Sequence, residues 1–475
     1  MSYRPNIKIS FGQISVGYIG LTDKFYDVVV CGAGMAGIAT AYSLAIKFQK
    51  RVLLIDEGAP LSLTSDKSTE CYRNWWGGPD NAMLSLMNRS INLMEEHAVE
   101  SNNSFQMRPH GYLFVTKNNN EAEQLYKQAK DAELLGVGCL REITKFSKYK
   151  LNNFESPISD QDGSDFISNK ETIKTLFPYL NKNTEAVLHV RRCGSLSAQQ
   201  LGMHLLEKAR EKSCEFQTGK FTGIETSGGK VSSVTIEQDG IENSIATDTL
   251  VLAPGPHLKS TLEKIGLDLP VLVEKHVKIS LPDTLNVVPR DAPLIIWNDP
   301  IELPWTNEEK SHLAESPETE WLLKTFPPGV HGRPVGAGNQ VLMYWTYDCE
   351  TSTYPKFPIE WDPYLPDVTL RGMAVMVPGL EKYFDPMPRP YVDGGYYTKT
   401  EENRPLIGPL KIPGAFVCGA FSGFGIMSAC GAGELLARHI TKADLPDYAD
   451  AFLPSRYEDP LYLEEIKKWV VDGQL

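Results

Sequence analysis

The chain has 475 residues, of which 42% are apolar and 23% are charged, so it can bury a large core and is not a disordered, collagen-like or coiled-coil protein. Asp and Glu outnumber Lys and Arg by 60 to 47, and the resulting net charge of −13 argues against general nucleic-acid binding. At roughly 150 residues per domain, the length suggests two or three domains, or two that interleave.

The eight cysteines are scattered and include no CxxC pair, which argues against a zinc site or a disulfide framework and suits a reducing compartment. Residues 1–24 read as a lead-in that lacks the apolar core of a signal peptide. No run reaches the ~18 apolar residues of a transmembrane helix. We therefore expect a cytoplasmic protein with no membrane span and no metal site.

Residues 26–58, YDVVVCGAGMAGIATAYSLAIKFQKRVLLIDEG, predict a buried strand, a glycine-rich turn, a helix and a second buried strand. In a G-x-G-x-x-G turn, the first glycine permits a tight bend, the second allows close approach of a pyrophosphate, and the third lets helix and strand pack. The helix N-terminus then faces the anion. An acidic residue after the second strand binds a ribose. The candidate dinucleotide-binding residues are Gly32, Ala33, Gly34, Met35, Ala36, Gly37 and Asp56, with Glu57 as the alternative acid.

The rest of the chain alternates between helical and strand patterns. Apolar spacing predicts helices over 83–99, 122–136 and 197–213. Strands are predicted over 111–116, 215–225, 230–237 and 245–253. Residues 281–370, rich in Pro, Trp, Asp and Glu, predict strands and long loops, and 414–440 predicts a strand, a glycine-rich turn and a long helix.

This layout favours FAD over a nicotinamide cofactor. The acid after the second strand argues against NADP but does not separate NAD from FAD. A simple nicotinamide dehydrogenase completes its nucleotide domain within ~150 continuous residues. Here the chain leaves the first unit and returns to it at 246–257 and again at 415–440, which is the layout of large flavoproteins.

Four segments together resemble the D-amino-acid oxidase / glycine oxidase / sarcosine oxidase superfamily of FAD-dependent oxidoreductases. They are GAGMAG with LLIDEG, TSDKSTECYRNWW (64–76), ATDTLVLAPGPH (246–257), and YYTKTEENRPLIGP with FVCGAFSGFGIMSACGAGELLA (396–437). The resemblance implies an α/β fold in which a Rossmann-like FAD-binding domain interleaves with a mixed-sheet α+β substrate domain. The expected boundaries are 24–80, 185–265 and 400–440 for the FAD domain, 81–184 and 266–399 for the substrate domain, and 441–475 for a C-terminal tail.

The resemblance also implies residues around the flavin. Ser65, Lys67, Ser68 and Arg73 belong to the stretch that wraps the ring, although a polar turn, or a surface cation–π pair of Arg73 with Trp75 or Trp76, explains the same pattern. A second turn presents backbone N–H groups to the pyrimidine edge, unless it is only a turn that packs the last helix. Its candidates are Gly419, Ser422, Gly423, Phe424, Gly425, Ile426 and Met427. Met427 stands where sarcosine-oxidase-like members carry a Lys that binds the substrate carboxylate.

The candidate catalytic residues are Arg73, Lys278, Tyr397 and Arg404. Lys278 would assist oxygen activation. Arg404 either approaches the flavin or the substrate, or forms an ion pair with Glu401 or Glu402. Tyr396 and Tyr397 lie on the last substrate-domain strand, where alternation turns one of them toward the pocket.

The roles of two further sets of residues have alternative interpretations. Cys71 and Cys349 are candidates for a covalent flavin link, but we expect non-covalent FAD, because buried structural thiols are commoner. Arg108, His110 and Arg333 are candidates for binding an anionic substrate, beside an ordinary structural role.

The function implied by the resemblance is FAD-dependent oxidation of a C–N bond in an amine or amino acid. A hydride moves to flavin N5, the imine hydrolyses, and the electrons pass to molecular oxygen or another acceptor. The alternatives are a flavin monooxygenase or C–C/C–O oxidoreductase, and an FAD-binding electron-transfer or assembly subunit. The expected partners are therefore a small amine or amino acid and an electron acceptor, without nucleic acid.

Overall fold

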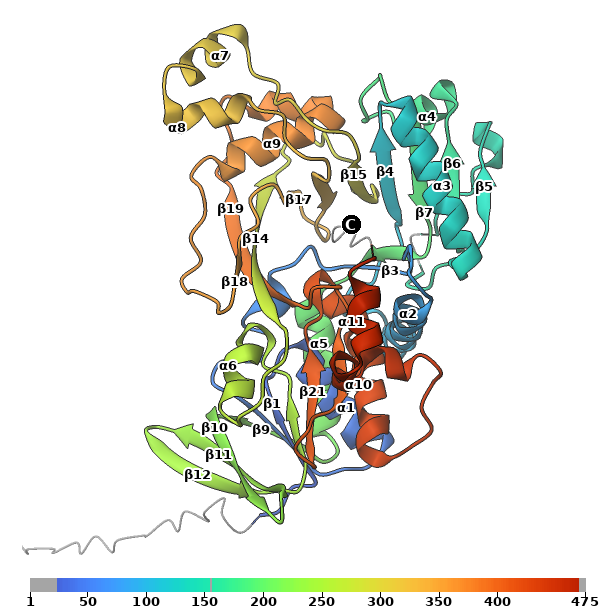
Figure 1. The fold of residues 1–475 in the computed structure, drawn as a ribbon. Coiled ribbons are helices and arrows are strands. Elements are labelled where there is room, and N and C mark those ends of the chain that lie inside the picture. The colour runs from blue at the N-terminus through green and yellow to red at the C-terminus, as the bar shows by residue number, and fades with distance from the viewer. Residues whose placement is uncertain (1–23, 154–155, 470–475) are drawn as a thin grey trace, which may run out of the picture.

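The computed structural model describes residues 24–153 and 156–469, and two large β-sheets organise them (Figure 1). The lead-in expected over residues 1–24 lies outside the described residues, except for Lys24. One sheet, with its helices, occupies the lower part of the view in Figure 1, and most of the other lies above it.

The first sheet has six strands in the order β20-β21-β13-β1-β2-β9. Their bounds are β1 Val28–Cys31, β2 Val52–Asp56, β9 Cys214–Thr218, β13 Leu250–Leu252, β20 Leu406–Pro409 and β21 Ala415–Gly419. All neighbours pair in parallel except β20, which is an antiparallel edge. Strands from the two ends of the chain therefore share one sheet, as the interleaved layout predicts.

Both faces of this sheet are covered. In β1, Val28 and Val30 point into the core formed with the helices on one face, and Val29 points into the core on the other. The helices of the first core are α1 Met35–Tyr42, α2 Ala82–Glu100, α5 Ala198–Arg210 and α10 Gly425–Thr441. The second core holds α6 Leu258–Glu263 and a three-stranded sheet of β10 Lys220–Ser227, β11 Lys230–Gln238 and β12 Ile241–Ala246. Burial of each such Val, Leu or Ile contributes roughly 1.5–3 kcal/mol.

The second sheet has ten strands and mixed pairing, in the order β18-β14-β17-β16-β15-β4-β7-β6-β5, with β19 against β14. Their bounds are β4 Tyr112–Thr116, β5 Leu140–Glu142, β6 Ser164–Ile167, β7 Ala186–Val190, β14 Leu272–Pro282, β15 Leu294–Trp297, β16 His331–Pro334, β17 Gln340–Tyr344, β18 Thr351–Ser352 and β19 Tyr391–Lys399. The helices of this half are α3 Asn119–Leu135, α4 Lys170–Leu176 and α9 Leu365–Met376. A two-stranded ribbon of β3 Cys71–Arg73 and β8 Cys193–Ser195 lies between the two sheets (Figure 1). The chain is thus an α/β protein with an interleaved mixed sheet.

Two short helices differ from the expectation for residues 281–370. α7 Asn307–Leu313 and α8 Pro317–Glu320 stand where strands and loops were expected. Thr306 and Glu309 form a reciprocal capping box at the start of α7. A Thr followed three residues later by Glu is a helix-start signal that the low apolar periodicity of this stretch obscured.

Two elements cross the expected domain boundaries. β7 pairs with β4 and β6 in the ten-stranded sheet, although a boundary at residue 185 groups it with the FAD segments. Helix α2 packs in the same core as α1 and α10, although its residues were expected in the substrate domain. We propose that β7 belongs to the substrate domain and α2 to the FAD domain, and that the other boundaries stand as given above.

Glu434 on α10 forms ion pairs with residues of two other helical segments, α2 and Ser43–Lys47. Its carboxylate accepts hydrogen bonds from Arg89 Nε at 2.6 Å and from Lys47 Nζ at 2.6 Å. Burial raises the pKa of this carboxyl, but the hydrogen bonds from Arg89 and Lys47 outweigh burial and lower the pKa to about 2. A carboxyl whose folded pKa is depressed stabilises the fold above its unfolded pKa, and that stability is lost as the pH falls through the folded value.

We therefore expect Glu434→Gln to lower the free energy of unfolding by roughly 2–3 kcal/mol at pH 7, and the loss to shrink as the pH falls from about 4.5 toward 2. Urea unfolding of both proteins across this range measures the difference. Glu458→Gln, which affects an exposed pair with Lys411, should change stability by less than about 1 kcal/mol throughout. A Glu434→Gln loss that persists undiminished at pH 2.5 would contradict the assignment.

Among the helices of residues 24–153 and 156–469, none combines the length and the apolar character needed to cross a membrane.

Candidate functional site

The glycine-rich turn between β1 and α1 is built for close backbone approach. Gly32 has φ +107°, and a Cβ there would lie 2.2 Å from the Ala253 carbonyl oxygen. A Cβ on Gly37 would lie 1.8 Å from the Gly32 carbonyl oxygen. Gly34 differs, because a Cβ on it would meet only Ser65 Oγ, at 3.2 Å. Gly32 and Gly37 therefore shape the turn, whereas Gly34 keeps space open in front of it.

Asp56 closes β2 beside this turn. Its Oδ2 accepts a hydrogen bond from Ala33 N at 2.7 Å, and its Oδ1 accepts one from Gly58 N at 2.8 Å. Each carboxylate oxygen keeps further acceptor capacity, which suits a ribose hydroxyl. Asp56 lines the cavity described below, and Glu57 is exposed and does not. The structure thus favours Asp56 over the alternative acid.

The segment after β2 forms another wall. Ser65 Oγ accepts a hydrogen bond from Met35 N at 3.0 Å, and Thr64 Oγ1 donates to the Tyr396 carbonyl at 2.8 Å. Ser65 and Ser68 line the cavity. Lys67 does not line it, because its ammonium pairs with Asp393 at 2.9 Å.

The C-terminal turn and the start of α10 form the wall contributed by the last part of the chain. Five of its seven candidates line the cavity, namely Gly419, Ser422, Gly423, Gly425 and Ile426. Phe424 and Met427 are buried and lie outside the lining. Phe424 packs its ring edge-on against Trp76 at 4.6 Å. α10 begins at Gly425, so the positive end of its dipole faces the cavity and favours negative charge there.

These walls surround a space of about 890 Å³, which includes the part that is open to solvent. Of the first turn, Gly32, Gly34, Met35 and Ala36 line it, whereas Ala33 and Gly37 support it from behind. The cavity is also lined by residues that the sequence did not single out: Leu61, Ser62, Leu63, Thr64, Ala253, Pro254, Gly255, Pro256, Thr398, Cys418, Ala420 and Phe421. Most of them present backbone or apolar surface. All except Leu61, Ser62 and Leu63 lie in the segments that carry the family resemblance, and that was the signal for them.

An elongated dinucleotide fits the chemistry of this lining. A helix N-terminus and an open glycine suit a pyrophosphate, a carboxylate suits a ribose, and the start of a second helix suits an electron-rich ring. FAD carries all three groups, so the residues present fit that cofactor.

Tyr397 is the one candidate catalytic residue that lines this cavity. Alternation predicted that only one of Tyr396 and Tyr397 would face it, yet both contribute to the lining. Tyr396 donates through its hydroxyl to the Lys356 carbonyl at 3.0 Å. Burial raises the pKa of Tyr397, so its hydroxyl stays a neutral donor.

A buried polar cluster supports Tyr397 from behind. The Tyr397 ring stacks on the His276 ring at 4.0 Å, and Tyr344 OH contacts His276 Nδ1. His276 Nε2 lies 2.8 Å from Glu274 Oε1. Burial lowers the pKa of His276, and hydrogen bonds from His276 and Lys399 hold the pKa of Glu274 at about 2. A neutral His276 that donates from Nε2 and accepts at Nδ1 satisfies both neighbours.

The structure places Arg73, Lys278 and Arg404 outside the cavity lining. Arg73 is buried, with its guanidinium 4.9 Å from the Trp76 ring centre. This is the cation–π arrangement considered above, but in the interior rather than on the surface.

Lys278 and Arg404 each contact other protein groups. Lys278 Nζ donates to the carbonyls of Asp66 and Ser68 at 3.2 and 2.8 Å, so it holds the cavity wall in place. Arg404 pairs with Asp80 at 2.6 Å. In the part of the chain that the structure describes, it forms no ion pair with Glu401 or Glu402, which was one of the two alternatives considered. The sequence could not show this pairing, because Asp80 is more than 300 residues away along the chain.

Residues 27–439 match a family model described as DAO, FAD dependent oxidoreductase. Among curated proteins, none matches this sequence.

Solved structures with the same fold cover nearly the whole chain. L-proline dehydrogenase from P. horikoshii has a TM-score of 0.69 at 18% identity, with 92% of this chain and 98% of that chain covered. Glycine oxidase from Geobacillus kaustophilus has a TM-score of 0.68 at 17% identity, covering 91% and 98%. Iminodiacetate oxidase from Chelativorans sp. BNC1 has a TM-score of 0.66 at 16% identity, covering 90% and 98%. At these identities the likeness shows the fold.

Proposed function

The chain belongs to the DAO family of FAD-dependent oxidoreductases, and from that membership we propose that it oxidises a C–N bond in an amine or amino acid. The observation that supports this proposal is that the glycine-rich turn, Asp56 and Tyr397 of the ten-stranded sheet all line one cavity. Structural neighbours named as a proline dehydrogenase, a glycine oxidase and an iminodiacetate oxidase support this reaction class.

When bound, FAD supplies the acceptor for the hydride that leaves the carbon next to nitrogen. The backbone at Gly34 and the start of α1 would hold its pyrophosphate, Asp56 a ribose, and the start of α10 the negative edge of its ring. We propose that the cofactor is not covalently linked, because Cys71 and Cys349, the two thiols considered for a link, lie outside the cavity lining.

The substrate would lie beside Tyr397, whose neutral hydroxyl can donate a hydrogen bond to it. The buried surroundings favour the neutral amine, which can release a hydride, over the ammonium, which cannot. The imine that results hydrolyses in water. The protein thus supplies orientation and electrostatics rather than an acid–base pair.

The test is an anaerobic absorbance titration of the purified protein with glycine, proline, iminodiacetate and a panel of further amines and amino acids. We expect a yellow protein whose flavin absorbance is bleached by at least one of these compounds. Readmission of air with detection of peroxide then separates an oxidase from a dehydrogenase. A yellow protein that no amine bleaches would contradict C–N oxidation, and it would favour electron transfer or another substrate class.

Tyr397→Phe is expected to lower kcat/KM at least tenfold while FAD content stays unchanged. The substitution removes one hydroxyl and keeps the ring that stacks on His276. A hydrogen bond to a charged or polarised group is worth about 1.5–3 kcal/mol, which corresponds to roughly a 10- to 100-fold change in rate. Steady-state kinetics with the identified substrate measures the change. Tyr391→Phe is the matched control, because Tyr391 is exposed at the start of the same strand, and equal losses in both variants would contradict a role at the site.

A further inference from the structure

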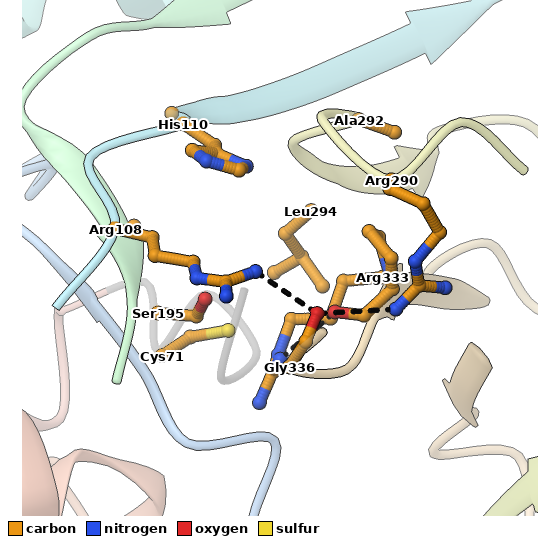
Figure 2. Close-up of a pocket in the computed structure, with 12 residues that line it drawn as sticks. Cys71, Arg108, His110, Ser195, Arg290, Ala292, Leu294, Arg333 and Gly336 are labelled. Carbon is orange, nitrogen blue, oxygen red and sulfur yellow. Dashed lines mark hydrogen bonds between the residues drawn. The ribbon is translucent and has the colours of Figure 1, made fainter. Parts of the chain in front are cut away.

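A second pocket collects positive charge beside the ten-stranded sheet (Figure 2). The space among its lining residues is about 320 Å³, which includes the part that is open to solvent. Three guanidinium groups line it, those of Arg108, Arg290 and Arg333, together with the imidazole of His110 and the side chain of Ser195. No Asp or Glu of the described residues contributes to this lining.

The three arginines reach the pocket from separate parts of the chain. Arg108 precedes β4 and forms an isolated bridge with Ser195, Arg290 precedes β15, and Arg333 lies in β16. In Figure 2 their side chains converge from different sides. Such convergence of like charges is unfavourable unless a negative group offsets it.

The protein itself offers little to offset this charge. Among the described residues, Glu70 is the one carboxylate that forms an ion pair with any of the three, with an oxygen 3.5 Å from Arg333 Nη2. Asp283 attracts Arg290 without forming an ion pair with it. Within the described part of the chain, Arg108 and Arg290 form no ion pair, in contrast to Arg333. Instead both donate to the backbone oxygen of Gly336, at 3.0 Å from Arg108 Nη1 and 3.3 Å from Arg290 Nη2. Arg290 also donates from Nη1 to the Gln340 carbonyl at 3.0 Å and from Nη2 to the Val335 carbonyl at 2.7 Å.

Arg108 and Arg290 keep N–H donors that form no hydrogen bond with the described residues, so these donors can bind a ligand. A guanidinium has five N–H donors, and the hydrogen bond to Gly336 accounts for one on Arg108. Arg290 Nε is buried and has no hydrogen-bond partner among the described residues. Burial lowers the pKa of His110 to about 4, so its imidazole is neutral at pH 7 and adds no further charge to the pocket.

We propose that this pocket is a binding site for a small oxyanion, a carboxylate or a phosphate, held by Arg108 and Arg290 with Arg333 beside them. The planar fork of a guanidinium matches the two oxygens of such a group. The site is separate from the dinucleotide cavity and does not depend on the proposed reaction.

The two sites share a wall. Ser68 lines the dinucleotide cavity, and Cys71 lines the arginine pocket. Between them, the Thr69 carbonyl accepts a hydrogen bond from Arg333 Nε at 2.8 Å. An anion beside Arg333 therefore lies against the backbone that carries Ser68.

The test is isothermal titration of the FAD-loaded protein with inorganic phosphate and, separately, with succinate, at an ionic strength fixed with sodium chloride. We expect saturable binding of at least one of the two anions, and the one that binds identifies the oxyanion class. Arg108→Gln and Arg290→Gln should each raise the Kd at least tenfold. Arg108→Lys keeps the charge without the fork and should give an intermediate Kd.

Arg438→Gln is the matched control. Arg438 also donates to a backbone carbonyl, that of Asp444 at 2.7 Å, but it lies near the end of α10. Its substitution should leave the Kd unchanged. FAD content and circular dichroism report whether each variant folds, and the titration of the wild-type protein does not depend on them. Absence of saturable binding by both anions, or binding that folded Arg108→Gln and Arg290→Gln variants retain in full, would overturn the proposal.

Discussion

Gly34→Val is expected to leave the fold intact and to reduce the FAD content of the purified protein more than tenfold. Gly34 has φ −76°, which a side chain tolerates, and a Cβ there approaches only Ser65 Oγ. The added methyl groups would instead occupy the space in front of the N-terminus of α1, where a pyrophosphate must approach the backbone.

Flavin absorbance per mole of protein measures this loss, and circular dichroism verifies the fold. Gly223→Val is the matched control, because a Cβ on Gly223 in β10 meets nothing within 4 Å, and this variant should retain its flavin. Gly32→Ala provides a contrast, since its φ of +107° and the clash with Ala253 predict damage to the turn itself. A Gly34→Val protein that stays fully yellow would place the cofactor elsewhere.

Arg456→Met is expected to lower the free energy of unfolding by about 3–5 kcal/mol. The guanidinium is buried, and its Nε and Nη2 donate to Glu402 Oε1 at 3.1 and 2.8 Å. It also donates to the Pro405 and Arg404 carbonyls at 3.1 and 3.0 Å, so it joins the C-terminal segment to the residues just before β20. Its loss leaves the buried Glu402 carboxylate without a cation, and the remaining partners of that carboxylate are tyrosine hydroxyls.

Urea unfolding measures this change, and a second substitution identifies its cause. When Glu402→Gln is added to Arg456→Met, the stranded charge disappears, so the double variant should be more stable than the sum of the single losses predicts. Lys467→Met, in an exposed pair with Glu464, should cost less than about 1 kcal/mol. Strictly additive losses would show that the charge pair is not the cause.

The nucleotide-binding half could be predicted from the sequence because its chemistry lies in local patterns. The strand, the turn, the helix and the acidic residue all lie within one continuous unit, Val28 to Asp56, and each of them follows from local geometry. The turn before α10 was likewise found, since a strand, glycines and a long helix follow one another there.

The roles of the charged candidates could not be predicted, because they depend on partners distant in sequence. Lys278 holds the carbonyls of the Asp66–Ser68 segment, and Arg404 pairs with Asp80. Arg108, which the sequence left between an anionic ligand and a structural role, meets Arg290 only through folding. A cation in a motif indicates that a positive charge is needed there. Only the fold shows which carboxylate or carbonyl group it contacts.

The interleaved six-stranded sheet has a consequence for synthesis in the cell. β1 and β2 are made first, but β21 and α10, which complete their sheet and cover their face, are encoded near the end of the chain. At about 5–20 residues per second, roughly 20 to 70 s separate the synthesis of β2 from that of β21. During that interval the valines and leucines of the first unit emerge from the ribosome without their final partners. The nascent chain therefore presents an apolar surface on which chaperones can act until translation is almost complete.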